Sequence, residues 1–137
     1  MAKKRGLGPV VHGGQAMPFG KGAVAGGFVF LSGAEGRDPE TGVPPKGIRE
    51  QTEIAFEKIR GRLAEAGGTL DDVVKFNWFL ADRSIKDEFQ SVRDEWLARN
   101  SNLVAEHSYG STMLFVEGMS HEDMLVEIDC IAYIGDD

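Results

Sequence analysis

The sequence contains very little cysteine. Cys130 is the only one among 137 residues, so the chain cannot form an internal disulfide or a thiolate-rich metal site. The three histidines, His12, His107 and His121, have no spacing that would place two on one face of an element, and we expect neither a metal nor another cofactor. A lone cysteine is typical of a reducing compartment, so we expect the protein to be cytoplasmic.

Long apolar runs and an excess of positive charge are also missing. No apolar stretch approaches the roughly 20 residues that a membrane span needs. The basic start, MAKKRGLG, has no apolar segment behind it and does not resemble a secretory signal. Acidic residues outnumber basic ones by 22 to 15, giving a net charge of −7, and no basic groove with interleaved aromatics is visible. These absences argue against a membrane and against nucleic acid as partners.

The remaining composition is that of an ordinary folded domain. Hydrophobic residues make up 42% and charged residues 27% of the chain, and this length is enough for one core without disulfides. We therefore treat residues 1–137 as a single domain. Residues 1–15 are expected to form a partly flexible N-terminal segment.

Five strands are predicted from runs of β-branched and aromatic residues. The segments GAVAG and GFVFLS, residues 22–26 and 27–32, meet at Gly26-Gly27, which is a hairpin signal. The other strands are predicted at 73–80, at about 109–117 and at 124–134.

Two helices are predicted from apolar residues at spacings of three and four. The first covers residues 48–66 and is ended by Gly67-Gly68. In the second, Ser84 with Asp87 resembles a capping box, and the apolar face consists of Ile85, Phe89, Val92 and Trp96. The resulting order, ββαβαββ, predicts an α+β fold with one mixed sheet and both helices on one face.

The sheet face away from the helices is predicted to be mixed. On the last strand, the side chains suited to the helix-covered core are Val126, Ile128, Cys130 and Ala132. The corresponding set on the 73–80 strand is Val74, Phe76, Trp78 and Leu80. Phe28 and Phe30 point away from Val29 and Leu31, so both faces are apolar there. Because a large apolar patch is rarely left in water, we expect a closed symmetric oligomer; the alternative is a solvated face with chance aromatics.

Three segments together resemble the Rid (YjgF) family, also labelled enamine/imine deaminases or L-PSP endoribonucleases. They are PFGKGAVAGGFVFLSGAEGRDPETG, LAEAGGTLDDVVKFNWFLAD and LVEIDCIAYI. The resemblance covers roughly residues 16 to 134, and its specificity comes from the order of the pieces FLSG, DPETG, AGG-LDDVVK and LVEI. It implies a chorismate-mutase-like α+β fold. It also implies a homotrimer whose sheets form a central barrel, with ligand clefts between neighbouring subunits.

The resemblance also implies a chemistry and a set of site residues. The best-known members hydrolyse 2-imino acids to 2-keto acids and ammonia without cofactor or metal. Glu127, the first carboxylate of LVEID, matches the family's water-handling glutamate. Ser32 and Gly33 match the serine and glycine that close the second strand. Phe19 stands where a cleft tyrosine is usual, and Arg93 where many members have asparagine.

The segment HSYGSTMLFVEG departs from the family pattern. Family members have an arginine at the start of this strand that holds the substrate carboxylate. Alignment places Gly110 there, and no arginine follows Arg99. Gly110 could leave room for a larger substrate or offer a backbone N–H. Other donors that could anchor the substrate are Arg93, His107, Tyr109 and Ser111.

Three functions remain open at this point. The first is a hydrolase acting on a small imine, enamine or related reactive metabolite, and the second is a module that only binds a small metabolite. The third, a nuclease, is disfavoured by the acidic charge.

Each candidate residue also has a purely structural explanation. Glu127 and Asp129 could face a polar barrel interior and be satisfied by Lys75 and water. Arg93 could lie on a solvated helix face or in a salt bridge between subunits. The other candidates could be loop, packing or strand-fitting residues, namely His107, Tyr109, Phe19 and Ser111.

Overall fold

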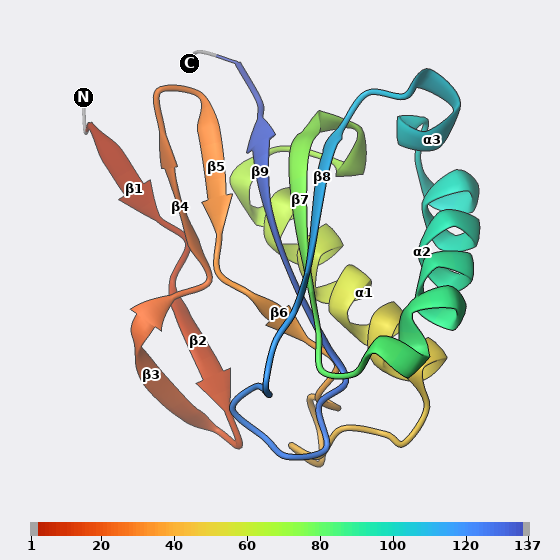
Figure 1. Ribbon diagram of the computed structural model, residues 1–137. Helices are drawn as coiled ribbons and strands as arrows, with labels where there is room; N and C mark the ends of the chain where they lie inside the picture. Colours follow the sequence, from red (N-terminus) through yellow and green to blue (C-terminus); the bar gives the residue numbers. More distant parts are fainter. Residues whose placement is uncertain (1–2, 136–137) are drawn as a thin grey trace.

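The core of the protein is a mixed sheet of seven strands with helices on a single face (Figure 1). The computed structural model describes residues 3–135. The strand order is β1-β4-β5-β9-β7-β8, and β6 also pairs with β9. The strands are β1 (Lys4–Gly6), β4 (Gly22–Ala25), β5 (Phe28–Leu31), β6 (Ala34–Glu35), β7 (Val73–Leu80), β8 (Gly110–Phe115) and β9 (Val126–Tyr133). Only β7 and β8 run parallel among these pairs, so the predicted α+β class with a mixed sheet is confirmed.

The helices form the second layer. They are α1 (Ile48–Ala66), α2 (Lys86–Asn100) and the short α3 (Leu103–Glu106), with 3-10 turns at Leu70–Asp72 and Arg83–Ile85. The bounds of α1 match the prediction, and Gly67 ends it in the left-handed region at φ 92°. Phe56 of α1 stacks on Trp96 of α2 with ring centroids 4.6 Å apart. The aromatic core therefore joins the two helices to each other and to the sheet.

The start of α2 corrects the sequence analysis. The Asp82 carboxylate accepts the Ser84 N–H at 2.8 Å and caps the 3-10 turn that precedes the helix. The helix itself begins at Lys86, so the capping box of Ser84 with Asp87 is wrong. Ser84 lies inside this turn and Ile85 is the N-cap of α2, so the serine hydroxyl is not at the position that caps the helix.

Hairpins build the N-terminal third of the chain. The predicted turn between β4 and β5 is confirmed, with Gly26 and Gly27 at φ 57° and 81°, as a type I′ turn requires. A further antiparallel hairpin, β2 (Pro9–His12) with β3 (Gln15–Gly20), was not predicted and lies beside the main sheet (Figure 1). Strands β1 and β2 fall in the segment for which partial flexibility was expected.

The face assignment on β7 is correct except at its start. Phe76, Trp78 and Leu80 are fully buried. Val74 is 42% exposed, because the pairing register between β7 and β9 shifts between Val73 and Lys75. The irregularity turns Val73 into the core in place of Val74, which a strict alternation could not foresee.

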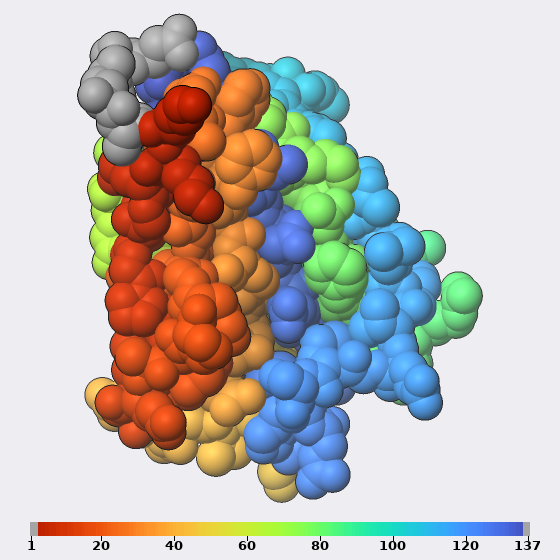
Figure 2. Space-filling view, turned by 90° about the vertical axis from the view of Figure 1, so that its left-hand side faces the viewer, coloured from red at the N-terminus to blue at the C-terminus, as the bar shows by residue number. Residues whose placement is uncertain are grey.

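The outer face of the sheet, opposite the helices, mixes aromatic and polar groups. Figure 2 shows the molecule from the side of the N-terminal hairpins, with the strands of the sheet running across its surface. Phe28, Phe30 and Tyr133 are 40%, 47% and 42% exposed, and the rings of Phe28 and Tyr133 lie 4.9 Å apart. Next to this aromatic patch, the Asn77 amide donates to Asp129 at 2.7 Å. The Lys75 ammonium donates to Asn77 and Thr112 at 3.0 and 2.6 Å. The predicted mixed character of this face is confirmed.

Within residues 3–135, no helix is both long enough and apolar enough to cross a bilayer.

Candidate functional site

A cavity of about 680 Å³ opens between the β2–β3 hairpin, the segment from Ser32 to Gly42, and α1. This volume lies within the range of small-molecule sites. Four predicted site residues line it: Phe19, Ser32, Gly33 and Glu127. Charged groups from α1 and the neighbouring loop complete the wall, and they include Lys58, Arg62, Glu65, Glu35 and Arg37.

Strand alternation directs Glu127 away from the core. Its neighbours Val126 and Ile128 are fully buried under the helices, so Glu127 points to the opposite face. Glu35 of β6 is its direct antiparallel partner. This pairing of β6 with β9 places two carboxylates side by side at the cavity.

Gly33 leaves the space that the Glu127 carboxylate occupies. A Cβ on Gly33 would collide with the carboxylate and lie only 3.1 Å from Glu127 Cγ. A β-bulge lies between β5 and β6. Phe30 pairs with Ile131 and Ala34 pairs with Ile128, so three residues on this side lie opposite only two on β9. Ser32 secures this bulge, since its hydroxyl donates to Gly20 O at 2.6 Å.

The surroundings of Glu127 disfavour its charge. Burial raises the pKa of its carboxyl group above the ordinary value, and the nearby carboxylates of Glu35 and Asp129 raise it further. A carboxyl group with a raised pKa holds a proton more readily and is better suited to return one to a substrate.

Glu35 is a member of the site that sequence reasoning missed. It is only 9% exposed. Its Oε1 lies 3.2 Å from Arg37 Nε and 3.7 Å from His12 Nε2. The Glu35 and Arg37 atoms face each other without hydrogen-bond alignment, so this contact is an ion pair only. The sequence offered no signal for it, because a strand of two residues has no measurable alternation.

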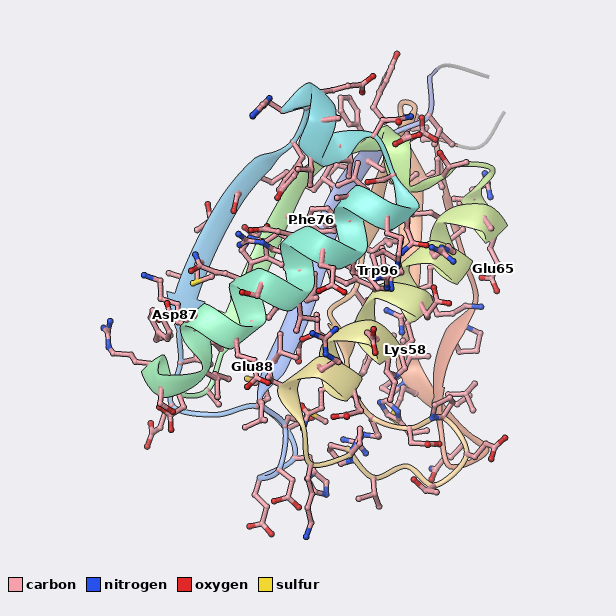
Figure 3. The ribbon with its side chains drawn as sticks, turned by 90° about the vertical axis from the view of Figure 1, so that its right-hand side faces the viewer. Lys58, Glu65, Phe76, Asp87, Glu88 and Trp96 are labelled. Atoms are coloured by element: carbon pink, nitrogen blue, oxygen red, sulfur yellow. The ribbon has the colours of Figure 1, made fainter. Side chains whose placement is uncertain are left out.

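The α1 wall contributes the cations Lys58 and Arg62, which were also missed. Lys58 Nζ donates to Glu35 O at 2.9 Å and Arg62 Nη1 to Ser32 O at 3.2 Å. Burial lowers the pKa of Lys58 to about 8 and also lowers that of Arg62. Figure 3 shows Lys58 and Glu65 along α1, and Glu65 pairs with Lys21 at 2.7 Å. The spacing of four on one helix was visible in the sequence, but nothing there located the cavity.

The other predicted residues lie at the β8 edge and do not line this cavity. Ser111 Oγ accepts the Trp78 indole N–H at 2.7 Å. The Tyr109 ring packs edge-on against Phe76 with centroids 5.5 Å apart. The Arg93 guanidinium bonds to Asp94 at 2.8 Å and lies over the Trp78 ring. Within the chain, these three side chains therefore contribute to packing.

His107 and Gly110 complete that edge. His107 ends α3 in the left-handed region at φ 51° and is exposed. Gly110 is exposed in register with Lys75, whose Cδ would lie 3.2 Å from a Cβ at position 110. The edge and the cavity are thus two separate groups of predicted site residues.

Metal and thiol chemistry find little support in the described part of the chain. Residues 3–135 contain no group of three or more His, Cys, Asp or Glu side chains arranged to hold a metal ion. Cys130 is 2% exposed, faces the core as predicted, and burial raises its pKa to about 12. Such a thiol is a poor nucleophile.

The comparison with known families decides the classification. The sequence model of the family described as Endoribonuclease L-PSP matches residues 14–134. The chain belongs to this family, which includes the Rid or YjgF proteins. A RutC family protein of Pyrococcus abyssi is 32% identical over 117 residues, which are 85% of this chain and 86% of that protein. The resemblance seen in the sequence is thereby confirmed.

Solved family structures share the fold. The Rid family protein YyfA of Yersinia pestis superposes with a TM-score of 0.79 at 21% identity, covering 96% of this chain and 99% of that one. TdcF of Escherichia coli with bound serine gives 0.76 at 22% identity, covering 93% of each chain. TdcF is named as a candidate reactive intermediate deaminase, and its sequence is 29% identical over 65 residues, covering 47% of this chain and 50% of its own.

Proposed function

We propose that the protein hydrolyses the C=N bond of a small imine, or of the imine form of an enamine, in the cavity beside Glu127. The observation that supports this most strongly is the Glu127 carboxylate. It lies over Gly33 in a ligand-sized cavity and has a raised pKa. The family relative TdcF, a candidate reactive intermediate deaminase, supports the same reaction class. The net charge of −7 favours a small molecule over RNA as the substrate.

The reaction needs only water and one group that transfers protons. The imine first takes up a proton from solvent, and Glu127 accepts a proton from a water molecule as the water oxygen bonds to the imine carbon, giving a neutral carbinolamine. Glu127 then returns its proton to the nitrogen, and the C–N bond breaks as ammonia leaves. The hydroxyl proton passes to Glu127 as the C=O bond forms and then to solvent, which replaces the proton taken up by the imine. The balance is one imine and one water to one carbonyl compound and one ammonia, without oxidant or reductant.

We further propose that the active unit is a homotrimer that uses the outer sheet face. The exposed rings of Phe28, Phe30 and Tyr133 support this, because such a patch is rarely left in water. In such an assembly the β8 edge of one subunit would lie near the cavity of the next and shield it from water, with its Ser111 side chain still bonded to Trp78. Light scattering should give about three times the chain mass of 14.9 kDa. A single-chain mass at working concentration would contradict this arrangement.

The test of the hydrolase is ammonia release from imino acids generated in situ by an amino-acid oxidase. We expect Glu127→Gln to lower the rate by about 10²–10⁴-fold, the usual contribution of a general acid–base group. Glu88→Gln, an exposed carboxylate on α2, is the matched control and should keep full activity. Unchanged turnover in Glu127→Gln would contradict the proposal. If the wild type releases no ammonia but small carboxylates raise its Tm, the protein is a binding module instead.

A further inference from the structure

Two lysines line the cavity, Lys21 and Lys58, and their amino groups have different partners. Lys21 Nζ lies 2.7 Å from a carboxylate oxygen of Glu65, and this ion pair requires the protonated ammonium. Lys58 Nζ instead donates to the backbone oxygen of Glu35 at 2.9 Å. Among residues 3–135, no Asp or Glu oxygen lies within 4.0 Å of Lys58 Nζ. Lys58 is therefore the cavity lysine without a carboxylate at contact distance.

The hydrogen bond from Lys58 does not require a charged amino group. A neutral amine has two N–H groups and one lone pair, so one N–H can serve the carbonyl oxygen while the lone pair stays unused. Glu35, which carries that oxygen, pairs in register with Glu127. The bond thus attaches the end of the Lys58 side chain to the paired strands β6 and β9, at the wall of the cavity.

The surroundings of Lys58 favour its neutral form. Burial has the largest effect, and with it the pKa of Lys58 falls to about 8. Among the charged neighbours, Glu35 and Asp38 raise the pKa, whereas Arg62 and Arg37 lower it. At neutral pH about one such amine in ten is unprotonated, against less than about one in a thousand for an ordinary lysine. Lysines that react with carbonyl compounds are commonly activated by such burial.

We propose that Lys58 is a reactive amine that captures small carbonyl compounds, such as 2-oxo acids, reversibly as an imine. The Nζ lone pair bonds to the carbonyl carbon, the carbonyl oxygen takes up a proton and the nitrogen loses one, giving a carbinolamine. The hydroxyl group then takes up a proton and leaves as water while the C=N bond forms, and the nitrogen returns a proton to solvent. One amine and one carbonyl compound give one imine and one water, without oxidant or reductant.

This capture goes beyond the proposed hydrolase and does not require turnover. The two activities meet in the cavity, because hydrolysis of an imine there releases a carbonyl compound, the class of molecule that Lys58 would take up. A captured molecule would occupy the cavity until its bond to Lys58 is hydrolysed.

The test uses pyruvate as the carbonyl compound and sodium cyanoborohydride, which reduces an imine to a stable secondary amine. Peptide mass spectrometry of the wild type at neutral pH gives the labelling rate of each lysine. We expect Lys58 to be labelled about tenfold faster than Lys46 and Lys86, which are exposed, because a larger share of Lys58 is unprotonated. Labelling of Lys58 no faster than that of these two lysines would overturn the proposal.

Two variants test whether the amine of Lys58 carries the reaction. Lys58→Arg keeps a cation and a hydrogen-bond donor but has no amine, and it should lose the dominant adduct. Lys21→Met removes the other lysine of the cavity and should leave labelling of Lys58 unchanged. An equally strong total labelling in Lys58→Arg would contradict the assignment.

Two conditions test the bond and the role of the fold. Without cyanoborohydride the adduct should disappear on dialysis, and an adduct that survives would show that the bond is not an imine. In the chain unfolded by guanidinium, the preference for Lys58 over Lys86 should vanish, and a preference that persists would show that the cavity does not cause it.

Ammonia release tests the hydrolase separately. If the wild type releases no ammonia from imino acids but Lys58 is labelled selectively, the capture stands and the hydrolase proposal fails. If ammonia is released and Lys58 reacts like an exposed lysine, the capture is wrong and the hydrolase proposal stands.

Discussion

Two regions of the molecule differ in the hydrogen bonding of their candidate side chains: the cavity beside Glu127 and the β8 edge beside Tyr109. At the edge, Ser111 accepts the Trp78 indole N–H and Arg93 is bonded to Asp94. In the cavity, the Glu127 carboxyl group has a raised pKa and its side chain makes no hydrogen bond within residues 3–135. A polar group whose partners lie inside the fold contributes to stability, whereas one facing a cavity without partners is available to a ligand.

The comparison limits what sequence resemblance can assign. The family resemblance pointed to residues in both regions equally, because an alignment matches positions in the chain and does not show which hydrogen bonds their side chains make. Arg93 shows the difference clearly. Its side chain is only 12% exposed and lies over the Trp78 ring, 5.2 Å from its centroid. Such a cation is already part of the core surface.

The largest expected effect is a loss of activity when the space beside Glu127 in the cavity is filled. Gly33→Ala should lower kcat/KM by about 10²-fold, because the new Cβ displaces the Glu127 carboxylate from its working position. Gly61→Ala is the matched control, since Gly61 also lines the cavity but a Cβ there meets nothing within 4 Å. Steady-state kinetics on both variants checks this, and full activity in Gly33→Ala would show that the position of Glu127 is unimportant.

The next effect falls on the β8 edge and should change stability without changing activity. Ser111→Ala leaves the buried Trp78 N–H without its acceptor, at a cost of about 1–3 kcal/mol in the free energy of unfolding. Denaturant unfolding measures this loss, and imine hydrolysis should stay at the wild-type level. Ser108→Ala, at an exposed position, should leave both unchanged. A variant Ser111→Ala that is fully stable but inactive would move Ser111 from the packing group into the site.

A smaller effect concerns the pH dependence of stability at Glu127. Its folded pKa lies above its ordinary value of 4.5, so the folded state is favoured below that value and loses stability as pH rises through the folded pKa. Glu127→Gln, which does not ionise, should therefore have a higher Tm than the wild type near neutral pH. The difference should vanish below the ordinary value. Thermal unfolding across this range tests the sign, and a Tm below that of the wild type at neutral pH would contradict it.

The smallest expected effect is at position 110. Gly110→Arg should give no gain in rate on the native substrate, because Gly110 does not line the cavity beside Glu127 and the site has formed without a cation at this position. The new side chain must also displace the stem of Lys75, whose Cδ lies 3.2 Å from the added Cβ. Gly110→Ala separates this crowding from the effect of the charge. A clear rate gain in Gly110→Arg alone would place an anionic group of the substrate at the β8 edge.

The local part of the fold was predictable from sequence. The helix 48–66 and the strand 73–80 have the predicted bounds. Each element is predicted by its own residues, because apolar side chains recur every three or four residues in the helix and β-branched and aromatic residues fill the strand. Ser84 was misassigned because a 3-10 turn, capped by Asp82, precedes the helix and moves the helix start beyond Ser84. Val74 was misassigned because the register shift depends on β9, far away in the chain.

By itself, the sequence determined the family and the order of the main elements, and it singled out Glu127 as the candidate carboxylate. Only the tertiary structure decided which charges share the cavity. Glu35 comes to Glu127 through the pairing of β6 with β9, and Lys58 and Arg62 through the packing of α1 against that edge. These residues are far apart in the chain, and they become neighbours because the elements that carry them pack together through their apolar faces. Their proximity therefore leaves no periodic trace in the sequence.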